Sequence, residues 1–159
     1  MKHFKLILFL CGTIGIAAVG CKKSNSVDMA DRVLVVEDLS HSACKTNAAR
    51  SSEREEYLEY HTVDSNYLYI KHVNASLNCC PDSIMVYSSI YDGKLQYLLC
   101  NKNNNCNCNC LYDVICKIGP LDYASYSMVV GVCTGSSAEI KIDFNDKTEG
   151  RILIKNLSE

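Results

Sequence analysis

The stretch "SIMVYSSIYDGKLQYLLC" (residues 83–100) places Asp92 and Gly93 between two apolar runs that contain β-branched and aromatic residues. Residues of these kinds are enriched in strands, and an Asp-Gly pair accepts the positive φ angles of a two-residue turn. The stretch therefore predicts a β-hairpin that turns at Asp92 and Gly93.

Six further runs of similar composition lie on either side of this hairpin. They are "YLEYHTV" (57–63), "YLYIKHV" (67–73), "LYDVICKI" (111–118), "YSMVVGVC" (126–133), "AEIKIDF" (138–144) and "RILIK" (151–155). Several alternate apolar and polar residues, which is the pattern of a strand with one face against a core. Short strands at nearly regular spacing, without a long amphipathic helix, predict an all-β fold, an antiparallel β-sandwich of the immunoglobulin-like kind.

One loop of this expected sandwich carries a further signal. In "IGPLDYASYSMVV" (118–130), Leu121 followed by Tyr126 resembles the tyrosine corner of immunoglobulin-like sandwiches. In such a corner, a tyrosine at the start of a late strand forms a hydrogen bond back to the preceding loop. We therefore expect Tyr126 to be buried, with its hydroxyl bonded to the backbone near Pro120 and Asp122.

The N-terminus, "MKHFKLILFLCGTIGIAAVGC" (1–21), has a basic start, an apolar run and small residues before Cys21. These are the parts of a secretory signal, and the apolar run is short for a membrane span. The end "AVGC" (18–21) resembles the lipobox of bacterial lipoproteins, in which the signal is cut before a cysteine that is then acylated. We therefore predict a signal peptide at residues 1–20, lipidation of Cys21 and a chain anchored to a membrane. An ordinary signal peptide that contains a cysteine is the alternative.

The sequence between Cys21 and residue 56 is mostly polar, with one short apolar run, "RVLVVEDL" (32–39). We therefore expect residues 21–56 to form a lipidated tether and residues 57–159 to form the β-sandwich domain. The formal net charge is −2, and basic residues do not cluster. Nucleic acid is therefore not expected as a partner.

Cysteines are unusually frequent in this chain, which contains eleven. Cys11 leaves with the expected signal and Cys21 carries the expected lipid. The remaining nine are Cys44, Cys79, Cys80, Cys100, Cys106, Cys108, Cys110, Cys116 and Cys133. This density in an exported chain indicates disulfides, and because nine is odd, at least one thiol stays free or pairs between chains.

Three of these cysteines stand two residues apart in "CNCNC" (106–110). In an extended chain, residues i and i+2 are about 6.6 Å apart, since each residue advances about 3.3 Å. Two thiolates on one zinc, each about 2.3 Å from it, need sulfurs roughly 4 Å apart. Extended C-x-C spacing therefore disfavours a shared metal, and it also lies near the upper Cα limit for a disulfide within the motif.

Neighbouring apolar runs offer other partners, because Cys79 and Cys80 end one run and Cys100 ends another. We predict that at least one of Cys106, Cys108 and Cys110 bonds to one of these three, so that disulfides staple the domain. A metallothionein-like thiolate cluster and a redox site are the alternatives, although the C-x-x-C motif of thioredoxin-like chemistry is absent. No cofactor and no resident metal are expected.

Three sequence elements carry a resemblance to a known group. They are an N-C-C element (78–80), a C-x-C-x-C-x-Y-D element (106–113) and an I-x-x-L-x-x-x-x-Y element (118–126). Together they resemble a group of small Bacteroidetes lipoproteins of unknown function, over roughly residues 57–155. The resemblance implies placement in the cell envelope and a compact β domain, and it implies no activity. The matching residues are Asn78, Cys79, Cys80, Cys106, Cys108, Cys110, Tyr112, Asp113, Ile118, Leu121 and Tyr126.

A few other residues are candidates for structural or modified sites. Tyr112 belongs to the inward row of its strand, and Asp113 is expected to cap a neighbouring backbone amide. The motif "DSI" (82–84) resembles the O-glycosylation sequon of exported Bacteroidetes proteins, with Ser83 as the acceptor. The scattered His41, His61 and His72 are expected to be structural.

Motifs of common enzymes are missing from the sequence: G-x-S-x-G, a phosphate-binding loop and carboxylates in a glycosidase-like context. We therefore expect a non-enzymatic lipoprotein of the bacterial cell envelope, on the periplasmic or surface face of the outer membrane. Its expected partners are the membrane, through the lipid, and a glycan, a peptide or an envelope protein. The alternative is an envelope protein that binds metal through thiolates or buffers redox changes.

Overall fold

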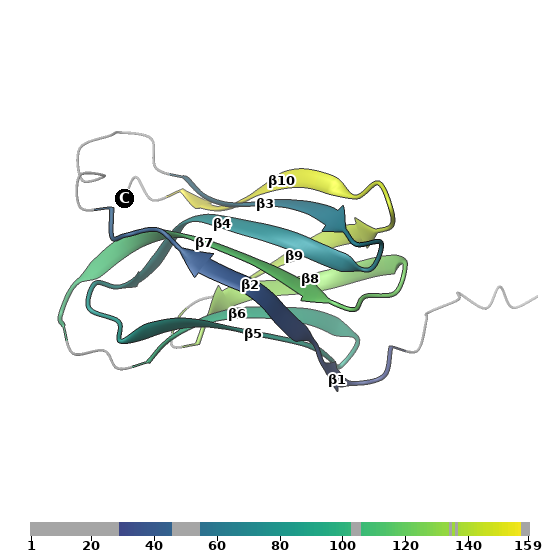
Figure 1. The fold of residues 1–159 in the computed structure, drawn as a ribbon, viewed down its shortest axis with the longest axis horizontal. Helices are drawn as coiled ribbons and strands as arrows, with labels where there is room; N and C mark the ends of the chain where they lie inside the picture. Colours follow the sequence, from purple (N-terminus) through teal and green to yellow (C-terminus); the bar gives the residue numbers. More distant parts are fainter. Residues whose placement is uncertain (1–28, 46–54, 103–105, 134, 136, 157–159) are drawn as a thin grey trace, which may run out of the picture.

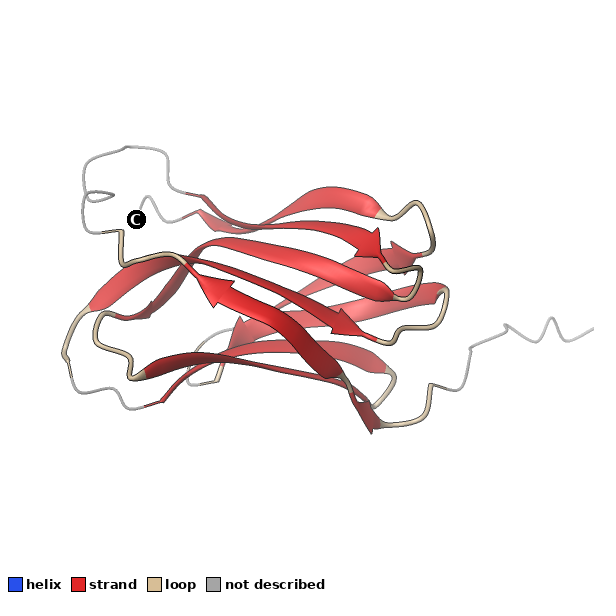
Figure 2. Ribbon diagram, viewed as in Figure 1, coloured by secondary structure: helices blue, strands red, loops and turns tan. Residues whose placement is uncertain are grey.

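The computed structural model describes residues 29–45, 55–102, 106–133, 135 and 137–156. Within these ranges ten strands form two five-stranded sheets that pack against each other (Figure 1). The described residues contain no helix, and hence no helix that is long and apolar enough to cross a membrane (Figure 2). The prediction of an all-β sandwich is confirmed, while its immunoglobulin-like character stays a prediction.

Each sheet takes strands from distant parts of the sequence. Sheet I has the order β1 (Arg32–Val33), β5 (Ser83–Tyr91), β6 (Lys94–Lys102), β8 (Ala124–Val132) and β9 (Ser137–Phe144). Sheet II has the order β10 (Glu149–Asn156), β3 (Glu55–Val63), β4 (Tyr67–Asn78), β7 (Asn109–Gly119) and β2 (Val35–His41). The pairs β3–β4, β5–β6 and β8–β9 are hairpins within one sheet, and the chain crosses between the sheets after β1, β4, β6, β7 and β9.

The hairpin of β5 and β6 turns where the sequence predicts. Asp92 and Gly93 have φ angles of 49° and 68°, and Tyr91 pairs with Lys94 directly before and after them. Two successive positive φ angles give a turn whose twist matches that of the strands. The hairpin prediction is confirmed.

One strand pair departs from the expected antiparallel arrangement. Among the described strands, β6 and β8 run parallel, with Leu95 opposite Met128 and Leu99 opposite Val132. The chain leaves sheet I after β6, forms β7 in sheet II and returns as β8. Two crossings restore the original direction, so β8 lies parallel to β6 and not antiparallel.

The expected boundary between tether and domain, at residue 57, lies too late in the chain. Arg32 and Val33 pair with β5, and β2 pairs with β7, so the run at 32–39 belongs to both sheets. Leu34, at the point where the chain changes sheet, is only 4% exposed. The sandwich therefore includes β1 and β2 of the segment predicted as tether, and Leu34 between them belongs to the core.

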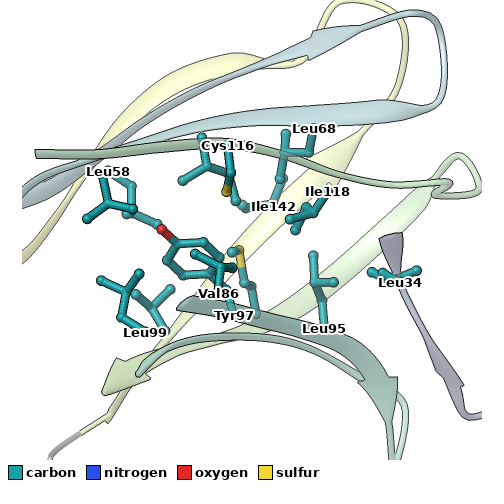
Figure 3. Close-up of a cluster of buried hydrophobic side chains, with 14 of the residues drawn as sticks. Leu34, Leu58, Leu68, Val86, Leu95, Tyr97, Leu99, Cys116, Ile118 and Ile142 are labelled. Carbon is teal, nitrogen blue, oxygen red and sulfur yellow. The ribbon is translucent and has the colours of Figure 1, made fainter. Parts of the chain in front are cut away.

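The core lies between the two sheets. Figure 3 shows Leu58, Leu68, Cys116 and Ile118 of sheet II facing Val86, Leu95, Tyr97, Leu99 and Ile142 of sheet I. Full burial of one large apolar side chain stabilises a fold by roughly 1.5–3 kcal/mol relative to exposure. The inward-facing residues of the strands in both sheets therefore form this core.

Candidate functional site

Cysteines from two loops meet at one end of the sandwich. The structure pairs Cys79 with Cys108 and Cys80 with Cys106, each pair with a Cα–Cα distance of 5.7 Å. The prediction that the C-x-C-x-C element bonds to Cys79, Cys80 or Cys100 is confirmed for Cys106 and Cys108. We call Cys79, Cys80, Cys106 and Cys108 the four-cysteine cluster.

Backbone pairing brings the two loops of this cluster together. Asn78, the last residue of β4, pairs with Asn109, the first residue of β7. The amide of Cys79 donates to the carbonyl oxygen of Cys108 at 3.1 Å. The side chain of Asn78 donates to the carbonyl oxygen of Cys106 and accepts from the amide of Cys80. The asparagine of the N-C-C element therefore holds both loops in place.

The sulfurs of this cluster lie closer together than the sequence predicts. The Sγ atoms of Cys79, Cys106 and Cys108 all lie within 4.8 Å of one another. Residues 106–108 bend before β7 begins at Asn109, so they are not an extended strand. The C-x-C spacing of Cys106 and Cys108 is therefore not extended, contrary to the prediction.

The remaining bridges join segments that the ladders bring side by side. Cys44 bonds to Cys110, and Cys100 bonds to Cys133. Cys100 is thus disulfide-bonded but not to the C-x-C-x-C element, because the parallel ladder of β6 and β8 places it beside Cys133. Cys44 lies in the segment predicted as tether, and this bridge fixes that segment to β7.

The odd cysteine among the described residues is Cys116, which is free and fully buried. It faces Tyr97 across the space between the sheets (Figure 3). Burial raises the pKa of the Cys116 thiol to about 12, although the Tyr97 hydroxyl opposes part of that rise. Burial also raises the pKa of Tyr97. Both groups are therefore neutral, and the thiolate that reacts with electrophiles is scarce.

The predicted hydrogen bond of Tyr126 is present. Its hydroxyl donates to the carbonyl oxygen of Asp122 at 2.9 Å and accepts from the Asp122 amide at 3.1 Å. Tyr126 is 1% exposed, and Leu121 is buried beside the same loop, with its amide donating to the carbonyl oxygen of Asn66. Both residues therefore fix the loop that leads into β8.

Tyr112 and Asp113 also have structural partners. The Tyr112 hydroxyl donates to the carbonyl oxygen of Asn78 at 3.3 Å. The Asp113 carboxylate accepts from the amide of Asn74 at 3.1 Å and forms an ion pair with Lys45. Asn74 has a φ of 59° and lies at a shift in the β4–β7 register. The expected cap is therefore confirmed, and it stabilises a β-bulge.

The three histidines do not come together. His61 stacks on Tyr69 with ring centroids 4.5 Å apart, while the buried His72 bonds through Nε2 to Glu56 at 2.8 Å. His41 packs edge-on against Tyr112. Ser83 begins β5, where it is partly exposed and pairs with Lys102, so its glycosylation stays a prediction.

A groove of about 1000 Å³ lies beside β1 and β5 of sheet I. Tyr87 and Tyr91 line it and are 55% and 63% exposed, and Val33, also in its lining, is 85% exposed. Ser89 and Gln96, which also line it, pair across β5 and β6. Strand periodicity does not predict this groove, although the alternation in β5 already separates the two tyrosines from the buried residues.

The predicted signal peptide at residues 1–20 and the predicted lipidation site Cys21 lie outside the described residues. The three elements that carry the resemblance to Bacteroidetes lipoproteins form the four-cysteine cluster, the Asp113 cap and the Tyr126 hydrogen bond, so each of them has a structural role. Family membership nevertheless stays a prediction. Comparisons of the chain with protein-family models, with curated proteins and with solved structures find no match.

Proposed function

We propose that this chain is a lipid-anchored protein of the bacterial cell envelope whose β-sandwich binds a neutral glycan in the groove of Tyr87 and Tyr91. The signal-like residues 1–20 and Cys21 support the placement in the envelope. Four disulfides agree with it, because disulfides persist mainly outside the cytoplasm.

The observation that carries the proposal is the pair of exposed tyrosine rings on one strand. Tyr87 and Tyr91 are four residues apart in β5, which is about 13 Å in an extended strand, and they share one face of the sheet. Leu98 lies opposite Tyr87 on β6, and it also lines the groove. Exposed apolar side chains that lie together on the surface often mark a ligand-binding groove.

The chemistry of the groove suits a sugar. Aromatic rings stack on the apolar C–H face of a sugar ring, and Tyr offers this area on a rigid side chain with a polar tip. Ser89 and Gln96, between the two tyrosines, provide donors and acceptors for sugar hydroxyls.

The charges at the groove favour a neutral ligand. Arg32 forms an ion pair with Asp122 at 2.9 Å, and the Asp31 carboxylate accepts a hydrogen bond from the Asp92 amide at 2.9 Å. Both charged groups are therefore engaged within the protein. Asp31 is the one carboxylate among the described residues that line the groove, whereas glycoside hydrolysis ordinarily uses two. The single carboxylate therefore supports binding of a glycan without its hydrolysis.

The test measures binding of neutral polysaccharides and their oligosaccharides by affinity electrophoresis and calorimetry. Tyr87→Ala and Tyr91→Ala should each weaken binding roughly tenfold, which corresponds to about 1.4 kcal/mol. Tyr123→Ala is the matched control, because Tyr123 is 56% exposed and does not line the groove. Unchanged affinity in both groove variants, or no binding of any neutral glycan by the wild type, overturns the proposal.

A further inference from the structure

The two bridges of the four-cysteine cluster lie side by side. The sulfur of Cys106 lies within 4.8 Å of both sulfurs of the Cys79–Cys108 bridge. We propose that this cluster, once its two bridges are reduced, is a thiolate site for one soft divalent cation such as Zn²⁺. This goes beyond glycan binding, because the cluster and the groove share no residue.

The distances suit such a cation. Two thiolates bound to one zinc at about 2.3 Å each have sulfurs roughly 4 Å apart. In the oxidised form the Cys79 and Cys108 sulfurs are bonded and the Cys106 sulfur lies within 4.8 Å of both, so after reduction the first two sulfurs have to separate by about 2 Å to reach this geometry. Cys80, which bonds to Cys106 in the oxidised form, is adjacent and competes with water for the fourth ligand position.

The main chain keeps the ligands together without the bridges. The Cys79 amide bonds to the Cys108 carbonyl oxygen, and Asn78 bonds through its side chain to the Cys106 carbonyl oxygen. Behind them, β4 and β7 continue the ladder up to the pair Asn78 and Asn109. The two bridges are nested and close nearly the same loop, so reduction of the second releases little further chain freedom.

A reductant has access to both bridges, because Cys80 and Cys108 are exposed. Two dithiol molecules, each oxidised to its own disulfide, supply the four electrons and four protons that convert the bridges into four thiols. The cation then replaces the protons of Cys79, Cys106 and Cys108, and these three protons go to solvent. Soft thiolate ligands favour Zn²⁺ over Mg²⁺ or Ca²⁺.

The experiment titrates the full chain with Zn²⁺ and with Cd²⁺, before and after reduction and anaerobic removal of the reductant. Cd²⁺ reports thiolate ligands through its ultraviolet charge-transfer absorption. The reduced chain should bind one cation with that absorption and with release of protons, and the oxidised chain should bind none. Circular dichroism recorded on the same samples follows the strands.

Variants identify the ligands. In the reduced state, Cys79→Ser, Cys106→Ser and Cys108→Ser should each weaken binding at least tenfold, and Cys80→Ser should weaken it only if Cys80 is the fourth ligand. The double variant Cys100→Ser/Cys133→Ser removes a distant bridge without leaving a free thiol, so it should bind as the wild type does. The proposal is overturned if the reduced chain binds no cation or loses its strands. It is also overturned if the Cys79, Cys106 and Cys108 variants bind the cation as tightly as the wild type does.

Discussion

The hydroxyl of Tyr126 makes two hydrogen bonds to the backbone of one residue, Asp122, as donor to its carbonyl oxygen and as acceptor from its amide. Because Tyr126 is 1% exposed, water does not readily replace these bonds. The pair therefore fixes the loop before β8 from within the core.

Tyr126→Phe should lower the free energy of unfolding by about 1–3 kcal/mol, because it deletes two hydrogen bonds that each contribute roughly 0.5–1.5 kcal/mol. Urea denaturation of the oxidised proteins measures the difference. Tyr123→Phe is the control, since Tyr123 is exposed and should leave stability almost unchanged. Equal stability of the Tyr126 variant and the wild type would contradict the role of this hydroxyl.

Asp113→Ala should lower the free energy of unfolding by about 1–3 kcal/mol, because it leaves the Asn74 amide at the bulge without its acceptor. Lys45→Met removes the partly exposed ion pair, worth roughly 0–1 kcal/mol, and the Lys45 hydrogen bond to the Asn74 side chain, but it keeps the acceptor of the Asn74 amide and should cost less. Denaturant titration of both variants separates the two contributions. A larger loss for Lys45→Met than for Asp113→Ala would show that the ion pair, and not the cap, dominates.

The Cys116 thiol should not react with alkylating reagents in the folded protein at neutral or mildly alkaline pH. Its pKa of about 12 keeps it protonated there, and the side chain is fully buried. After denaturation without reduction, mass spectrometry should find one more labelled thiol in the wild type than in Cys116→Ala. Labelling of Cys116 in the folded state, or no difference after denaturation, would contradict this assignment.

Cys21→Ser should release the chain from the membrane fraction or block its processing, since the predicted lipid attaches to this sulfur. Cell fractionation and the mass of the mature chain provide the measurement. The control is Cys11→Ser, a change inside the predicted signal that should leave anchoring intact. A Cys21→Ser chain that is still processed and still membrane-bound would show that Cys21 is not the anchor.

Local features of the sequence predicted much of this fold. The Asp92-Gly93 turn depends only on its own φ preferences, and the alternation in β5, β7 and β9 depends only on which face meets the core. The same holds for Tyr126, whose partner is four residues away along the chain.

The edge strands β1 and β2 could not be predicted in the same way. Leu34 is buried while its neighbours Val33 and Val35 are exposed, but all three residues are apolar, so the sequence does not show which of them faces the core. Its burial follows from a change of sheet, which depends on partners in β5 and β7 far along the chain.

By itself, then, the sequence determined the all-β class, the central hairpin and the presence of a disulfide-rich domain, because turn preferences, strand periodicity and cysteine frequency are local or compositional. Only the tertiary structure decided which cysteines pair, since eight cysteines allow 105 pairings and strand register selects among them. The parallel β6–β8 ladder brings Cys100 to Cys133, and the bend at 106–108 gathers the sulfurs of the four-cysteine cluster. Register and bends arise from contacts between distant segments, and a single sequence does not display those contacts.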